Sequence, residues 1–181
     1  MSKTMKLAFV MIFALLAQGI AKAQSPATKR IGEQTSFHED DKSFDNAMRL
    51  PDNVLNALKA TKEAREILGD KPDLNSDQLA ELFSAVEVHL SVPNEADYIV
   101  KGNFPLVGAD NSWFWIVRST PILPKVILFA NGNSITLMKR RTNGYRNIRS
   151  DWSSAAESIT EVFRFNGSSY KFSLKTDRQV P

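Results

Sequence analysis

The chain has 181 residues, among them 23 Lys and Arg, 20 Asp and Glu, two His and no Cys. Without cysteine there are no disulfides, no zinc site with cysteine ligands and no thiol nucleophile. The formal net charge of +3 is small, and it gives no reason to expect nucleic acid as a partner.

The first 23 residues have the pattern of a secretory signal. Lys3 and Lys6 precede an apolar run from Leu7 to Leu16, and Ala21 and Ala23 are the small residues that a signal peptidase requires. The run is shorter than the roughly 20 residues that span a bilayer. We therefore expect a Sec-type signal peptide cleaved after Ala23, a periplasmic or secreted product, and no stable membrane insertion after signal cleavage.

Removal of the signal leaves 20 basic and 20 acidic residues, because the only charged residues of the signal are three Lys. The remaining charge is uneven: residues 24–97 contain 15 acidic and 8 basic residues, and residues 98–181 contain 5 acidic and 12 basic residues. Complementary charges on two faces of one domain explain this division. A basic binding surface is the alternative.

Polar and charged residues dominate positions 24–49, which predicts a flexible leader. Apolar residues recur at helical spacing over residues 51–68 and predict an N-terminal helix of the domain. Ser76 can cap a short second helix over residues 78–83. We expect one domain over residues 50–176 and a C-terminal tail over residues 177–181.

Beyond residue 84 the apolar and β-branched residues alternate with period two, which predicts strands. Three Asn-Gly pairs separate some of them and favour type I′ hairpin turns. The predicted fold class is α+β, with the helix and the short second helix packed on one antiparallel, hairpin-rich β-sheet. The predicted strands are 86–90, 98–101, 112–118, 125–130, 135–139, 145–149, 159–165 and 170–174, and the pairs are Asn131-Gly132, Asn143-Gly144 and Asn166-Gly167.

Catalytic and metal motifs are sparse. His38 and His89 are the only histidines, and their predicted positions in a leader and a strand do not favour a Ser-His-acid triad. We assign no catalytic residue, no cofactor and no metal ligand, and consider the protein more consistent with a binding protein than an enzyme. Glu157 and Glu161 keep a two-carboxylate mechanism open, although surface solvation also explains them.

An aromatic segment occupies the predicted strand 112–118. Alternation places Trp113 and Trp115 on one face of the strand, and Phe114 and Ile116 on the other. A central strand that is buried on both faces explains this pattern. The alternative is an exposed aromatic platform that binds a glycan or a protein partner.

A basic cluster surrounds the Asn143-Gly144 turn. Its residues either keep an exposed turn soluble or form a contact surface for an acidic or anionic partner. Together with the aromatic segment they are the candidate binding residues of the chain: Trp113, Trp115, Lys139, Arg140, Arg141, Tyr145, Arg146 and Arg149.

Four short motifs follow one another between residues 86 and 175. They are Gly108-Ala109-Asp110-Asn111, Trp113-Phe114-Trp115-Ile116, Asn143-Gly144-Tyr145-Arg146-Asn147-Ile148 and Phe163-Arg164-Phe165-Asn166-Gly167-Ser168-Ser169-Tyr170. The chain resembles a broad group of uncharacterised secreted or periplasmic bacterial proteins that share G-A-N, W-I-F, N-G-Y-x-D-I and Y-R-F-D-G-x-x-Y hairpin motifs. The resemblance implies a compartment and a hairpin-rich fold, and it implies no activity.

The chain departs from that group at two places. Asn147 stands where the group has Asp, and Val92 and Pro93 stand where an acidic calcium loop would have polar ligands, so no calcium site is expected. The predicted function is that of a non-catalytic, secreted or periplasmic binding protein for an unknown envelope protein or glycan, for example in an inhibitor-type interaction. The alternative is a cell-wall or glycan hydrolase with paired carboxylates.

Overall fold

The computed structural model describes residues 33–69, 74–91, 96–109, 111–120 and 123–179. The predicted signal peptide and the beginning of the predicted leader lie outside the described residues. The described elements, in chain order, are β1 (Ser36–His38), α1 (Asp52–Lys59), α2 (Lys62–Leu68), α3 (Ser76–Glu81), β2 (Phe83–Val88), β3 (Asp97–Gly102), β4 (Ser112–Arg118), β5 (Lys125–Gly132), β6 (Ser134–Thr142), β7 (Tyr145–Ser153), β8 (Glu157–Phe165) and β9 (Tyr170–Gln179).

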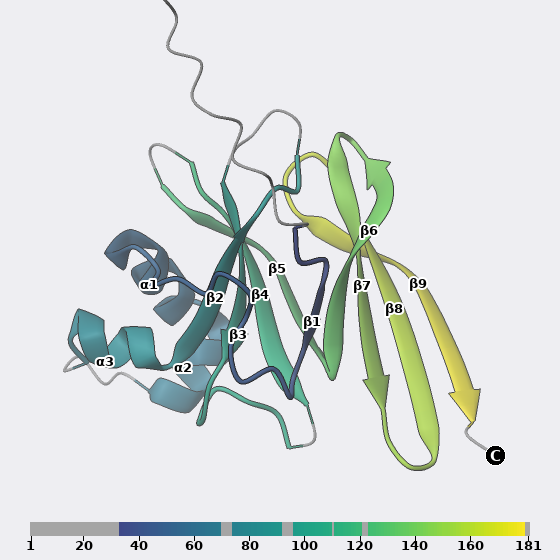
Figure 1. Ribbon diagram of the computed structural model, residues 1–181, viewed down its shortest axis with the longest axis horizontal. Coiled ribbons are helices and arrows are strands. Elements are labelled where there is room, and N and C mark those ends of the chain that lie inside the picture. Colours follow the sequence, from purple (N-terminus) through teal and green to yellow (C-terminus); the bar gives the residue numbers. More distant parts are fainter. Residues whose placement is uncertain (1–32, 70–73, 92–95, 110, 121–122, 180–181) are drawn as a thin grey trace, which may run out of the picture. The chain divides into compact units, whose positions relative to one another are not determined.

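The strands form two antiparallel sheets, where the sequence predicted one (Figure 1). Strands β2, β3, β4 and β5 form a four-stranded sheet in that order, and the second sheet has the order β1-β6-β7-β8-β9. Within each sheet the strands that follow one another in sequence are also neighbours. The chain changes sheets between β5 and β6, a step that strand periodicity does not reveal because both strands alternate in the same way.

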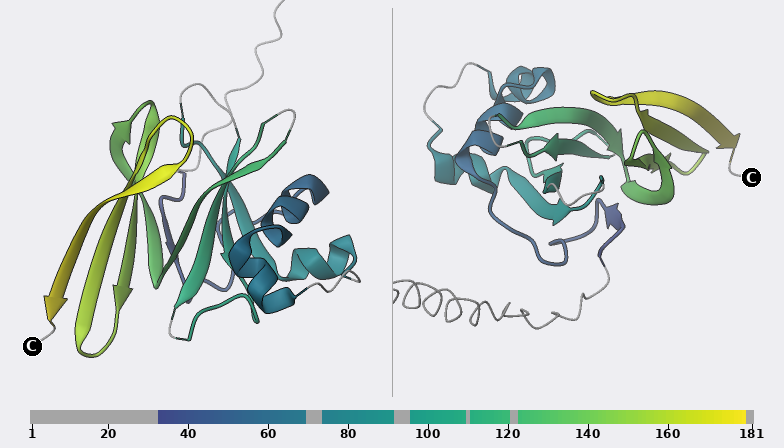
Figure 2. Two further views of the ribbon diagram at one scale, coloured as in Figure 1. Left: turned by 180° about the vertical axis from the view of Figure 1, so that it is seen from behind. Right: turned by 90° about the horizontal axis from the view of Figure 1, so that it is seen from above.

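The sheet of β2 to β5 is buried on both faces, with the helices on one side and the second sheet on the other (Figures 1 and 2). Its helix-facing side chains, such as Trp115 and Val100, pack with Leu55 and Leu58 of α1. Its opposite face, which includes Phe114, packs against the second sheet. The result is three layers around two apolar cores.

The helix predicted over residues 51–68 is divided into α1 and α2. Thr61 makes the break: its hydroxyl donates to the carbonyl of Leu58 at 2.7 Å and accepts from the backbone N–H of Ala64 at 3.3 Å, which caps α2. The short helix α3 begins two residues before the predicted start at residue 78. A capping box of Asn75 and Gln78 fixes its first turn.

The Asn-Gly pairs have three different roles. Asn143 and Gly144 both have positive φ, at 49° and 81°, and close the β6–β7 hairpin as predicted. At the β8–β9 connection only Gly167 has positive φ, and the Asn166 side chain accepts from the backbone N–H groups of Ser168 and Ser169. The hairpin exists, but its turn is longer than the predicted type.

Gly132 is not in a hairpin turn, and the prediction of one there is wrong. It lies where the chain leaves the first sheet and passes close to β7. A Cβ atom at Gly132 would lie 2.6 Å from Ser150 Oγ and 2.8 Å from the carbonyl oxygen of Asp151. Glycine is therefore required there by the close approach of the two strands.

The described part of the predicted leader, residues 33–49, contains a strand and buried side chains. β1 pairs with β6, and Phe37 is completely buried, with its ring centroid 5.2 Å from that of Phe44. The Lys101 ammonium donates to the carbonyls of Glu39 and Asp41 at 2.9 and 2.6 Å. Two buried rings and one buried cation thus hold a segment whose average composition is too polar to indicate packing.

β9 continues to Gln179, into the residues 177–181 that the sequence predicts as a C-terminal tail. From residue 171 onward every described side chain of β9 is exposed. Phe172 is 56 % exposed. β9 is an edge strand of the second sheet, so it has a neighbour on one side only.

Candidate functional site

The aromatic strand β4 is a core strand. Trp115 has no exposed surface and contacts Phe83 and Phe129, with ring centroids 5.7 and 5.4 Å away. Trp113 lies on the same face, partly buried against Phe129 at 5.7 Å. Of the two interpretations of this segment, the buried strand is the correct one, and Trp115 forms no platform for a ligand.

Two arginines of the predicted basic cluster hold the β6–β7 hairpin in place. Arg146 is ion-paired with Glu33 at 2.8 Å and donates through Nε to the Met138 carbonyl at 3.1 Å. Arg141 donates to the carbonyls of Leu90 and Gly144 at 2.6 and 3.1 Å. Both side chains are therefore held by contacts within the protein itself.

The other members of the cluster do not form one surface with them. Tyr145 is buried and stacks on Phe165 with ring centroids 4.0 Å apart. Arg149 donates through Nε to Asp151 at 2.8 Å. Lys139 and Arg140 have exposed side chains on β6, which agrees with the interpretation of a solvated basic turn.

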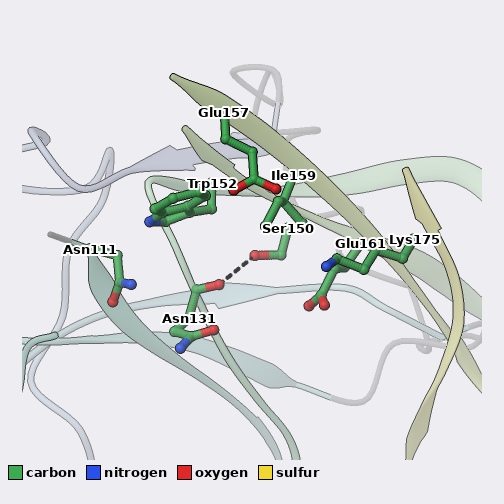
Figure 3. Close-up of a pocket in the computed structure, with 8 residues that line it drawn as sticks. All are labelled: Asn111, Asn131, Ser150, Trp152, Glu157, Ile159, Glu161 and Lys175. Carbon is green, nitrogen blue, oxygen red and sulfur yellow. Dashed lines mark hydrogen bonds between the residues drawn. The ribbon is translucent and has the colours of Figure 1, made fainter. Parts of the chain in front are cut away.

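A pocket of about 280 Å³ lies between β5 of the first sheet and β7 to β9 of the second (Figure 3). This volume is close to the lower end of the range of about 300–1,000 Å³ that is usual for small-molecule sites. An aromatic ring, two carboxylates, an ammonium group and two amides surround it. The lining residues are Asn111, Asn131, Ser150, Trp152, Glu157, Ile159, Glu161 and Lys175.

Strand alternation brings these side chains together. Ser150, Glu161 and Lys175 stand opposite one another across β7, β8 and β9, and Trp152 stands opposite Ile159 in the next row. Residues two apart in a strand share a face, so the two rows form one wall of the pocket. Figure 3 shows the Trp152 ring beside Glu157, with Glu161 and Lys175 farther along the same wall.

The base of the pocket is fixed by a hydrogen bond between the two sheets. The Ser150 hydroxyl donates to the carbonyl oxygen of Asn131 at 2.9 Å, and Ser150 is almost fully buried. This contact holds β5 against β7, while the Asn131 side chain remains exposed. This hydrogen bond therefore connects the wall of the pocket to its base.

Both carboxylates belong to one strand. Glu157 and Glu161 are four residues apart on β8, so their Cα atoms are about 13 Å apart at roughly 3.3 Å per residue. Lys175 lies opposite Glu161 and forms an ion pair with Asp177 at 3.3 Å. The pocket thus presents acceptors along one wall and a single cation at one end.

Sequence reasoning singled out Glu157 and Glu161 but missed the rest of the site. Ser150 and Trp152 are two residues apart on one strand, and Glu157 and Glu161 are four residues apart on the next. This spacing is visible in the sequence and could have placed all four residues on one face of the sheet. Asn131 could not have been found this way, because its pair with Gly132 has the pattern of a hairpin turn.

Within the described ranges, none of the helices has the length and apolar character needed to cross a membrane. In the same part of the chain, no group of three or more His, Asp or Glu side chains could hold a metal ion. Comparison with protein-family models, with curated proteins and with solved structures found no match. The resemblance to secreted bacterial proteins stays a prediction, and any function must be inferred from the geometry of the site.

Proposed function

We propose that the chain is a non-catalytic binding protein, secreted or periplasmic, whose pocket between β5 and β7–β9 takes a polyhydroxylated ligand such as a cell-wall glycan. The compartment is supported by the signal pattern of residues 1–23. The ligand class is supported by the chemistry of the pocket walls.

The observation that carries this proposal is the position of Trp152 within a ring of polar groups. A tryptophan ring offers a large apolar face at low cost in conformational entropy. The carboxylates of Glu157 and Glu161 accept hydrogen bonds, and the side chain amides of Asn111 and Asn131 both donate and accept. A sugar needs the same combination, because its ring has apolar C–H faces and a rim of hydroxyls.

The geometry favours binding over hydrolysis. Glycosidases place two carboxyl groups on either side of the scissile bond, about 5–5.5 or 6.5–9.5 Å apart. Glu157 and Glu161 project from the same strand into the same wall, so they do not face each other across the pocket. Paired carboxylates remain the chemical basis of the alternative, a glycan hydrolase.

Calorimetric titration tests the proposal. The chain from residue 24 onward would be titrated with soluble muropeptides and with chito-oligosaccharides. We expect binding to at least one of them, weakened at least tenfold by Trp152→Ala and severalfold by Glu161→Gln. Phe104→Ala is the matched control, because Phe104 is a highly exposed aromatic residue that does not line the pocket.

Two outcomes would contradict the proposal. If neither ligand class binds, or if Trp152→Ala and Phe104→Ala weaken binding equally, the pocket is not the site. If incubation releases shorter oligosaccharides, and Glu157→Gln or Glu161→Gln abolishes the release, the protein is the hydrolase of the alternative.

A further inference from the structure

The outer face of β7, β8 and β9 differs in chemistry from the face that lines the pocket. Alternation turns Arg149, Ser158, Thr160, Thr176 and Arg178 away from the pocket. These five residues surround a separate hollow of about 340 Å³. Three hydroxyls and two guanidinium groups thus meet on one side of the sheet.

Register brings the five side chains into contact range. Thr160 stands opposite Thr176, and Ser158 stands opposite Arg178 on the next row. Arg149 stands opposite Val162, one row beyond Thr160 on the other side. The two arginines therefore lie at opposite corners of the cluster of three hydroxyls. Their long side chains can both reach the centre of this cluster.

Hydrogen bonds already orient one side of the hollow. Asp151 accepts from Arg149 Nε at 2.8 Å and from the Thr160 hydroxyl at 2.7 Å. This arrangement holds Arg149 by one nitrogen only. Its terminal Nη groups, like the whole guanidinium of Arg178, have no hydrogen-bond or ion-pair partner in the part of the chain that the structure describes.

Charge separates the two faces of these strands. Two further cations, Arg164 and Lys171, stand opposite each other at the far end of β8 and β9, and both are exposed. On the other face, the pocket has the carboxylates of Glu157 and Glu161 and one ammonium. The outer face also carries the Asp151 carboxylate, but its four cations outnumber this one anion, so it is the face that attracts anions.

From this geometry we infer that the outer face of β7–β9 is a binding site for a phosphate or sulfate group. Two guanidinium groups offer paired donors that match an oxyanion, and the hydroxyls of Ser158 and Thr176 add single donors. A tetrahedral oxyanion has enough oxygens to accept from all of them, whereas a carboxylate has only two. The phosphate or sulfate group can belong to a soluble ligand or to a lipid headgroup.

Titration with inorganic phosphate and with sulfate, followed by backbone amide chemical shifts, tests the inference. We expect shifts centred on residues 158–160 and 176–178, and at least a fivefold loss of affinity in Arg178→Gln. Thr176→Val should weaken binding without changing net charge. Arg65→Gln, which removes an exposed arginine of α2, is the matched control and should bind like the original protein.

Sedimentation with vesicles that contain phosphatidylglycerol, compared with purely zwitterionic vesicles, identifies the source of the group. Binding to anionic vesicles that Arg178→Gln abolishes assigns the site to lipid headgroups, and phosphate binding without vesicle binding assigns it to soluble ligands. The inference is overturned if no probe binds, or if Arg65→Gln and Arg178→Gln weaken binding equally. Trp152→Ala should leave this binding unchanged, which separates the outcome from that of the glycan pocket.

Discussion

At the scale of single residues, the space between the two sheets contains a polar and aromatic cluster. The guanidinium carbon of Arg118 lies 4.9 Å from the ring centroids of both Tyr145 and Phe165, which is within the range of cation–π attraction. Tyr170 packs against Phe165 and donates its hydroxyl to the Arg146 carbonyl at 2.6 Å. These contacts tie β4 to the second sheet at its hairpin end.

The Tyr170 hydroxyl should make the free energy of unfolding depend on pH in the alkaline range. Burial raises the pKa of this hydroxyl above its usual value of about 10, and the negative charge of Asp97 adds to the shift. The folded protein therefore holds this proton more tightly than the unfolded chain does. The stabilisation is fully present below about pH 10 and is lost as the pH rises further.

Tyr170→Phe tests this dependence. The variant loses one hydrogen bond, so near pH 7 its free energy of unfolding should be lower by about 0.5–1.5 kcal/mol. Above pH 10 the difference between the two proteins should shrink, because only the original protein loses stability through this hydroxyl. Urea denaturation between pH 7 and pH 11 measures it. A difference that stays constant over this range would show that the hydroxyl ionises equally in both states.

At the scale of secondary-structure elements, the positions of β2 to β9 follow from local pattern, but most of their exact ends and the partners of the strands do not. β4 has the predicted bounds 112–118, because aromatic and β-branched residues follow one another there without interruption. β1 was missed, since three residues in a charged context carry no period. Its pairing with β6 depends on residues about 100 positions away.

Two phenylalanine substitutions test whether burial in the structure, and not strand alternation in the sequence, decides how much a side chain stabilises the fold. Phe37→Ala removes a fully buried ring from β1 and should lower the free energy of unfolding by about 3–5 kcal/mol. Phe172→Ala removes a ring that is 56 % exposed and should cost only about 1 kcal/mol, mainly through its edge contact with Phe163. Chemical denaturation of both variants measures this. Equal losses, or a larger loss for Phe172→Ala, would place β1 outside the core.

At the scale of the whole described unit, the sheet of β2 to β5 belongs to both apolar cores. Neither the helices nor the second sheet can keep a core if this sheet unfolds. The Gly132 crossing and the Ser150 hydrogen bond join the two sheets near the pocket. The unit should therefore unfold in one cooperative step.

Hydrogen exchange as a function of denaturant tests this cooperativity. Amides of β4 and β7 should become exchangeable with the same dependence on denaturant, because both strands are lost in the same global event. Amides of β9 on its unpaired edge should exchange faster and with little dependence on denaturant. If β7 exchanges at clearly lower denaturant than β4, the sheets unfold independently and the shared core does not couple them.

The sequence by itself determined the strand-forming segments, the Asn143-Gly144 hairpin and the alternation that places Glu157 and Glu161 on one face, since each of these depends on residues close together in the chain. It also carries the signal pattern of residues 1–23. The tertiary structure alone decided which strands share a sheet, why Gly132 is a crossing and not a turn, and that Trp115 is core. It also brought Asn131 to Trp152, because pairing between distant strands is set by packing and hydrogen bonds that no local pattern encodes.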